Sequence, residues 1–385
     1  MTPADLSSTV LHAVRRAVDE DALRAPVPAR VRVERTRPGG RGDYASAVAL
    51  QLAGPAALPA REVAEILRAR MAGLPGIGRV EITGPGFLNF TLAAATDAAA
   101  HSALVHQVLA QGTRYGHGDA LAGVPLQFSH AREVRAAVTA DAVRRLVRAQ
   151  GTSVRISCHG PSDPDWARLG IAVDAHGQPP VPPAELPTEI RPVPAGAAAG
   201  ELLARLGPDA TRWGLLRPAG HDRAPLGGEL LVQGEGNPLF LVRYAHSRAR
   251  ALSRGAELLG FTGGGGGQDP GDTHGPSDTQ NLGNTQDAGE AAFEEPEALA
   301  LLAAIADHPA VLAAAARHRA PDRLARHLEA VAHAFFDFHD AASPLPVGDE
   351  KPSAAHRTRL ALAEAAGTVL AGGLSLLGVS APPYL

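Results

Sequence analysis

Two side chains able to exchange protons stand three residues apart near the middle of the chain. His130 and Glu133 follow a short apolar run, Val124–Phe128, and precede a stretch with helical spacing, Glu133–Ala149. Histidine and carboxylate groups serve most often in acid–base catalysis, so this pair is one candidate for an acid and a base. The other histidines are scattered, without HExxH or comparable metal spacing, so we expect no metal site.

Cationic chemistry in this chain depends almost wholly on arginine. Lys351 is the only lysine among the 385 residues. The run Gly263–Gly267 is not followed by the Gly-Lys-Ser/Thr of a Walker phosphate-binding loop, so we interpret it as a linker. We therefore expect no cofactor.

Tyr244 and Arg248 offer a different chemistry. They lie one helical turn apart, with Arg243 and Arg250 nearby, which would gather them on one side of a helix. Arginines neutralise phosphate, and aromatic rings stack on unpaired bases at ~1–3 kcal/mol per base. A solvated basic face has the same pattern, so on the residues alone both interpretations stay open.

Composition limits the class of protein. The net charge is −4, but residues 261–300 hold eight acidic residues and no lysine or arginine, so the remainder is net positive. No apolar run reaches the ~20 residues that span a bilayer, and we expect no membrane contact. Cys158 is the only cysteine, and the N-terminus lacks the pattern of a secretion signal. These features predict a cytoplasmic protein.

Residues 1–117 have the pattern of an α+β domain. The spacing predicts three helices and two strands, namely helices over Leu6–Val18, Arg61–Ala72 and Ala100–Gln111, and strands over Val31–Thr36 and Arg79–Leu92. In the last strand, Leu88, Phe90 and Leu92 alternate toward one side, as core residues do. Phe87 and Asn89 are then expected to point away from the core.

Residues 118–230 predict a reduced α/β domain, and residues 231–385 an all-α helical bundle. Strand Val124–Phe128, helix Glu133–Ala149 and strand Ser153–Ser157 form one βαβ unit. The proline-rich stretch Pro161–Pro194 is interpreted mostly as linker, and two helices follow, over Gly200–Leu206 and Pro208–Leu216. A seam spaced alternately by three and four residues follows, formed by Val242, Ala245, Ala249, Leu252, Ala256 and Leu259. The acidic insert 262–294 has little to bury and is expected to be disordered.

Three stretches, in order along the chain, resemble arginyl-tRNA synthetases. RGDYASAVALQLAG (Arg41–Gly54) with VEITGPGFLNFTL (Val80–Leu92) resembles the family's N-terminal additional domain, which grips the tRNA elbow. LGPDATRWGLL (Leu206–Leu216) with NPLFLVRYAHSRARALSR (Asn237–Arg254) resembles the end of the catalytic fold and the first helix of the DALR-type anticodon-binding bundle. RLARHLEAVAHAFFDFHD with LALAEAAGTVLAGGLSLLGVSAP resembles the closing helices of that bundle. The resemblance implies tRNA contacts at Tyr44, Gly86, Phe87, Asn89, Asn237, Tyr244, His246 and Arg248.

The middle of the chain departs from that family. Setting the helix after the family's His-x-Gly-His signature against this sequence places His130, Ala131, Arg132 and Glu133 over the signature. An arginine side chain then fills the glycine position, and Glu133 replaces the second histidine, where it would repel a triphosphate. No lysine precedes Lys351 to serve as the family's KMSKS-type cation.

These features predict a non-catalytic tRNA-binding relative of the synthetases with no catalytic residue. Its expected partner is arginine tRNA, and His130, Arg132 and Glu133 would be remnants of an ATP site. One alternative is a scaffold subunit that has lost RNA binding and docks on a synthetase or an amino-acid biosynthetic enzyme. Another is residual enzyme activity that uses His130 and Glu133.

Overall fold

The chain forms two separately packed units, an N-terminal unit of residues 1–100 and a C-terminal unit of residues 101–385. The computed structural model describes residues 3–36, 41–74, 76–92, 98–123, 125–177, 188–263, 289 and 291–385. The division lies before the boundary predicted at residue 117. It differs because the turn that follows helix α4 (Ala98–Gln111), the short helix η1 (Gly112–Arg114), packs on the last helix of the chain.

The N-terminal unit is a four-stranded antiparallel sheet packed with three helices. The strand order is β1-β2-β4-β3, with β1 at Glu34–Arg35, β2 at Tyr44–Ser46, β3 at Ile77–Thr83 and β4 at Phe87–Leu92. The helices are α1 (Pro3–Asp19), α2 (Val48–Ala56) and α3 (Ala60–Met71). One apolar cluster holds the unit together, in which Val10 of α1, Leu67 of α3 and Phe90 of β4 have no exposed surface. The predicted α+β class is confirmed.

The predicted strand Arg79–Leu92 is instead a hairpin. Gly86 has a φ of +140°, and a Cβ there would lie 2.8 Å from the carbonyl oxygen of Ala60, so only glycine fits the turn between β3 and β4. Helix α2 was not predicted. It contains Gly54 and Pro55, residues that disfavour a helix in sequence, and burial of Leu52 compensates for them.

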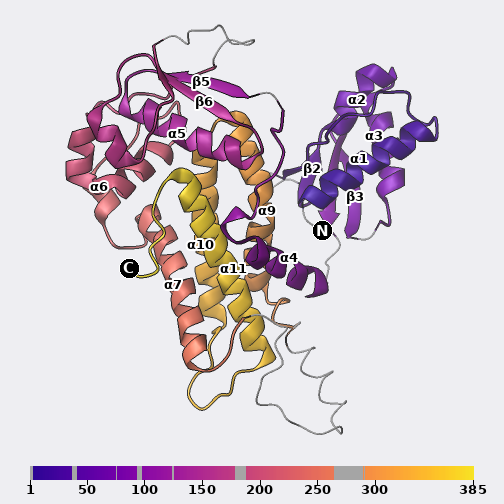
Figure 1. The fold of residues 1–385 in the computed structure, drawn as a ribbon. Coiled ribbons are helices and arrows are strands. Elements are labelled where there is room, and N and C mark those ends of the chain that lie inside the picture. The colour runs from indigo at the N-terminus through magenta and orange to yellow at the C-terminus, as the bar shows by residue number, and fades with distance from the viewer. Residues whose placement is uncertain are drawn as a thin grey trace. The chain divides into compact units, whose positions relative to one another are not determined.

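The C-terminal unit contains a parallel sheet in the order β7-β6-β5-β8. Figure 1 labels its two central strands, β5 and β6. Its strands are β5 (Leu126–His130), β6 (Val154–Cys158), β7 (Ala175–His176) and β8 (Thr188–Ile190). Helix α5 (Val134–Ala149) joins β5 to β6, as the predicted βαβ unit requires. The first residue of the predicted strand, Val124, lies outside the described residues.

The stretch predicted mostly as a linker carries short structure. Helix η2 (Pro164–Leu169) and strands β7 and β8 lie in it, and both strands occupy sheet edges, where proline-rich chain is tolerated. Residues 178–187 lie outside the described residues. Helix α6 (Ala199–Leu216) then breaks at Gly207, whose φ of +74° divides it at the point between the two predicted helices.

Long helices of the described residues form the bundle of the C-terminal unit (Figure 1). They are α7 (Pro238–Leu258), α9 (Pro296–His318), α10 (Pro321–Ala341) and α11 (Ala354–Leu377), and η3 (Gly228–Leu231) precedes them. The predicted seam of α7 is buried up to Ala256, but Leu259 is exposed because the helix ends beside it. Most of the insert predicted over 262–294 lies outside the described residues. Its far end is not free of packing, because Ala292 and Phe293 are buried.

Two bundle helices are long and apolar enough to cross a membrane by length and composition, Pro296–His318 and Ala354–Leu377. The sequence-based statement that no such run exists is therefore wrong. The apolar window of α11 is 78% buried in the bundle, and that of α9 is 39% buried. A core helix passes the same test, so neither helix calls for a bilayer.

Candidate functional site

The residues predicted as an ATP-site remnant lie between β5 and α5. His130 is fully buried, its Nδ1 lies 2.8 Å from the carbonyl oxygen of Ala131, and burial lowers its pKa. The Arg132 Nε donates to the carbonyl oxygen of Pro161 at 2.8 Å. Each side chain thus makes one contact that fixes the loop, while Arg132 stays exposed and the buried Nε2 of His130 has no hydrogen-bond partner among the described residues.

Glu133 caps helix α5. Its Oε2 accepts the amide of Ala136 at 2.8 Å, and its Oε1 accepts the amide of Ala195 at 2.9 Å. A carboxylate at an N-cap satisfies a free amide and meets the positive end of the helix dipole. Glu133 therefore has a structural role as a helix cap. From the sequence alone, its carboxylate was interpreted as a charge that would repel a triphosphate.

Of the four candidate residues in the N-terminal unit, only Phe87 is exposed, at 39%. Tyr44 is buried on β2 opposite Phe90, and Gly86 makes the hairpin turn. Asn89 is also buried, and its Nδ2 donates to the Thr83 hydroxyl at 2.7 Å. The prediction that Asn89 points away from the core missed this use of its amide within the hairpin.

Two of the four bundle candidates face inward. Asn237 caps α7 by accepting the amide of Leu239, and its Nδ2 donates to the carbonyl oxygens of Leu230 and Val232 at 2.9 and 2.8 Å. His246 is buried with its Nδ1 3.0 Å from the carbonyl oxygen of Gly367 on α11, and burial lowers its pKa. These side chains hold the bundle and are not presented to a partner.

The other two candidates, Tyr244 and Arg248, form one exposed surface. The ring of Tyr244 is stacked between Phe240 on its own helix, at 5.5 Å and 12°, and Phe336 of α10, at 5.4 Å and 23°. We call Phe240, Tyr244 and Phe336 the aromatic stack. Tyr244 is 42% exposed although its ring is held on both sides. Such a ring is preorganised for contact with a further planar group.

Basic groups continue this surface toward the end of the chain. Arg248 is exposed, and its Nε lies 3.2 Å from the Nε2 of His339 on α10. One helical turn beyond Arg250, the guanidinium of Arg254 lies 4.2 Å above the ring of Tyr384. Sequence reasoning did not place Phe336 or His339 here, because α7 and α10 are far apart in sequence, and it also missed Phe240, which lies one turn before Tyr244 on the same helix.

The residues that the structure describes contain no group of three or more His, Cys, Asp or Glu side chains placed to share a metal ion. The aromatic stack and its arginines can instead bind a planar, anionic polymer by stacking and charge.

The sequence matches two families, each at one end of the chain. Residues 5–92 match the family described as arginyl tRNA synthetase N terminal domain, and residues 277–385 match the DALR anticodon binding domain. The chain belongs to the arginyl-tRNA synthetase family. Tyr244 precedes the second match, so that match alone does not assign the aromatic stack.

Relatives and solved structures agree with this family. The arginine–tRNA ligases of Renibacterium salmoninarum and Frankia alni are 27% and 28% identical to the chain, covering 99% of it and 100% of their own lengths. The alignment with the first spans 573 positions against 385 residues here. The arginyl-tRNA synthetases of Thermus thermophilus and Plasmodium falciparum superpose with TM-scores of 0.60 and 0.61 at 14% and 9% identity. The first covers 100% of both chains, and the second covers 100% of this chain and 99% of its own.

These relatives correct one prediction. We expected that the chain is not an enzyme, but this arginyl-tRNA synthetase family member matches proteins named as ligases over 99% of its length. The physical basis of that prediction is also weaker than it looked, because Glu133 has a capping role that does not depend on ATP.

Proposed function

We propose that this chain binds tRNA through the aromatic stack and the neighbouring Arg248, and that arginine tRNA is the tRNA it selects. The single observation that carries the proposal is the exposed ring of Tyr244, held between Phe240 and Phe336 beside an exposed arginine. Membership of a family with an anticodon-binding domain supports RNA as the partner, and the names of the relatives support arginine tRNA.

Stacking supplies affinity and the arginines supply charge neutralisation. A base stacked on Tyr244 would contribute about 1–3 kcal/mol, and each phosphate neutralised would release counterions. The Phe240 and Phe336 rings fix Tyr244 before binding, so little side-chain entropy is lost on contact. The net charge of −4 does not oppose this, since residues 261–300 hold eight acidic residues and no lysine or arginine, and the remainder of the chain is net positive. We place this binding in the cytoplasm, where tRNA is available and the sole cysteine would stay reduced.

Fluorescence anisotropy with labelled arginine tRNA, a second tRNA and bulk tRNA tests the proposal. We expect arginine tRNA to bind most tightly, and Tyr244→Ala to weaken it about 5- to 150-fold, the factor equivalent to one stacked base. Leu258→Ala is the matched control, because Leu258 lies on the same helix and is 89% exposed outside the stack. Arginine tRNA binding no better than bulk tRNA would refute the selectivity.

A second measurement addresses the substrates named by the relatives. Formation of arginyl-tRNA from arginine, ATP and arginine tRNA should be assayed with the same variants. If the stack positions tRNA, Tyr244→Ala raises the tRNA concentration needed for half-maximal rate and leaves that for arginine unchanged. Absence of tRNA binding, with a protein that co-purifies stoichiometrically, would instead support a scaffold role.

A further inference from the structure

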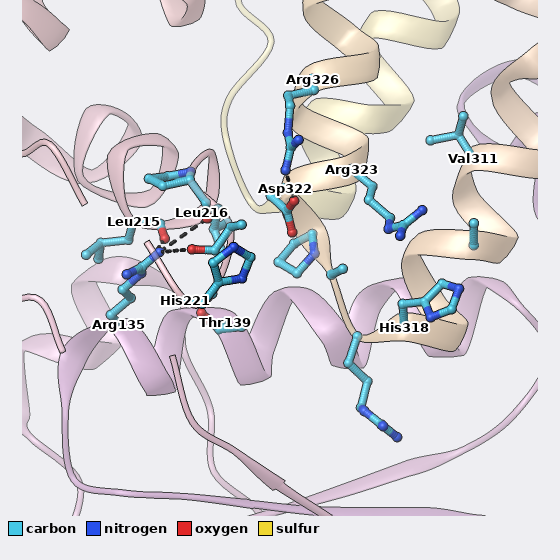
Figure 2. Close-up of a pocket in the computed structure, with 17 residues that line it drawn as sticks. Arg135, Thr139, Leu215, Leu216, His221, Val311, His318, Asp322, Arg323 and Arg326 are labelled. Carbon is cyan, nitrogen blue, oxygen red and sulfur yellow. Dashed lines mark hydrogen bonds and ion pairs between the residues drawn. The ribbon is translucent and has the colours of Figure 1, made fainter. Parts of the chain in front are cut away.

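A basic cleft of about 750 Å³ opens in the C-terminal unit, apart from the aromatic stack. Its walls come from α5, from the end of α6 with the loop after it, and from the turn between α9 and α10 (Figure 2). Arg217 at the end of α6 donates two hydrogen bonds to Glu329 of α10, at 2.9 and 3.1 Å, and so ties two of these walls together. The cleft is therefore a built feature of the fold.

Basic side chains dominate the lining of the cleft. Four arginines and two histidines face one carboxylate, namely Arg135, Arg319, Arg323, Arg326, His221 and His318 against Asp322. Asp322 is engaged by Arg326 in an ion pair, drawn as a dashed line in Figure 2. The side chains of Arg319 and Arg323 are exposed and have no hydrogen bond or ion pair with any residue that the structure describes. Two guanidinium groups are thus available to a ligand.

Arg135 adds charge to the cleft but no contact. It is 1% exposed, and all five of its N–H donors are used by backbone carbonyl oxygens. The acceptors are those of Val193, Leu215, Pro218, Ala219 and Asp222. No carboxylate bonds to it, although the carboxylates of Glu133, Asp222 and Asp322 lie near enough to interact with its charge. Its positive charge acts on the cleft through a medium of low polarity.

The rest of the lining selects the kind of anion. Leu216, Val311 and Ala314 give the cleft an apolar side, and its volume lies within the range of small-molecule sites and well above the size of an inorganic ion. Figure 2 shows Arg323 between its own helix and Val311 of α9, with Arg135 and Leu215 on the opposite side. Guanidinium groups match phosphate in shape and bind it with two parallel hydrogen bonds.

We propose that this cleft binds a phosphate ester with an apolar or planar body, its phosphate held by Arg319 and Arg323. The start of helix α10 at Pro321 adds the favourable end of a helix dipole beside the same phosphate. The phosphate comes either from a free nucleotide-sized molecule or from an RNA chain, and both present the same chemistry to the arginines.

Isothermal titration of the full chain with inorganic pyrophosphate and with adenosine monophosphate tests the site. Arg319→Ala and Arg323→Ala should each weaken binding about tenfold or more, the loss equivalent to one charge-assisted hydrogen bond. Asp322→Asn should tighten it, because the variant frees Arg326 and removes the only carboxylate of the cleft. Arg148→Ala is the matched control, since Arg148 is exposed on α5 and does not line the cleft.

Two further arms separate this site from tRNA binding by the aromatic stack. Tyr244→Ala should leave pyrophosphate affinity unchanged even where it abolishes tRNA binding. Displacement of pyrophosphate by tRNA identifies an RNA phosphate as the occupant, whereas simultaneous binding identifies a small phosphate ester, and either result supports the site. Equal pyrophosphate affinity in the natural chain and the Arg319→Ala/Arg323→Ala double variant would overturn it, as would failure of both phosphate probes to bind.

Discussion

Replacing Glu133 with alanine separates a structural role from an electrostatic one at the start of α5. The variant removes the acceptor for the Ala136 amide at the helix N-terminus, at a cost of about 1 kcal/mol. It also leaves the Ala195 amide without its partner, at about 1–3 kcal/mol, and the lower half applies because this amide is only partly buried. We therefore expect the C-terminal unit to lose about 2–3 kcal/mol of unfolding free energy.

The chain offers a selective probe for this measurement. Its two tryptophans, Trp166 and Trp213, both lie buried in the C-terminal unit, so tryptophan fluorescence during urea unfolding reports on that unit alone. Glu133→Gln keeps one acceptor oxygen and should lose about half as much. Glu201→Ala is the control, because Glu201 is exposed on α6 and removing its ion pair with Arg205 should cost less than ~0.5 kcal/mol.

The opposite outcome would restore the interpretation drawn from sequence. If Glu133 repels a triphosphate rather than capping a helix, Glu133→Ala and Glu133→Gln leave the unfolding free energy within ~0.5 kcal/mol of the natural chain and tighten ATP binding equally. That pair of results would refute the capping argument, because a cap cannot be removed without loss of stability.

Three further changes test the packing around the proposed sites. Asp141→Asn removes the carboxylate 2.8 Å from the buried guanidinium of Arg212, and tryptophan fluorescence should show a loss of about 3–5 kcal/mol, partly recovered in the Asp141→Asn/Arg212→Met double variant. His308 is buried with its pKa well below its usual 6.5, so the unfolded chain takes up the proton first and stability falls as pH drops below about 6.5, by up to about 1.4 kcal/mol per pH unit. His308→Gln should flatten this dependence in urea titrations at a series of pH values, and an unchanged slope would show that other groups cause it. Gly86→Ala should destabilise the N-terminal unit by about 1–3 kcal/mol, measured by hydrogen exchange of the β3 and β4 amides, whereas Gly54→Ala, with open space at its Cβ, should not.

Helices, strands and their buried faces were predictable wherever a pattern repeats over many residues. The seam of α7 and the βαβ unit follow from spacing alone, because several apolar side chains must share one face before either can be buried. The break at Gly207 was also visible, since Gly-Pro cannot continue a helix. The β3–β4 hairpin was not, because its strands carry apolar residues in phase across the turn and read as one continuous strand.

Polar candidates were harder to place than apolar ones. Asn89, Asn237 and His246 lie in motifs that resemble a tRNA-binding family, yet each uses its side chain on a partner within the fold. Sequence spacing indicates the side of an element on which a residue lies. Sequence spacing does not indicate whether a carbonyl, hydroxyl or amide group of another element lies within hydrogen-bond distance. A buried polar group needs such a partner.

The basic cleft also could not be predicted from local sequence patterns. Arg135 lies 184 residues before Arg319, and Arg323 follows four residues later (319 − 135 = 184, 323 − 319 = 4). Nothing in their local sequence patterns marks the three arginines as a set. Arg135 was predicted only as one residue of the helix Glu133–Ala149, but burial and five carbonyl acceptors make it the fixed charge behind the cleft. A residue with no spare donor cannot be replaced by lysine without stranding carbonyl oxygens, because an ammonium has only three donors. Arg135→Lys should therefore disturb the loop at residues 217–222, and with it the cleft, although the formal charge is unchanged.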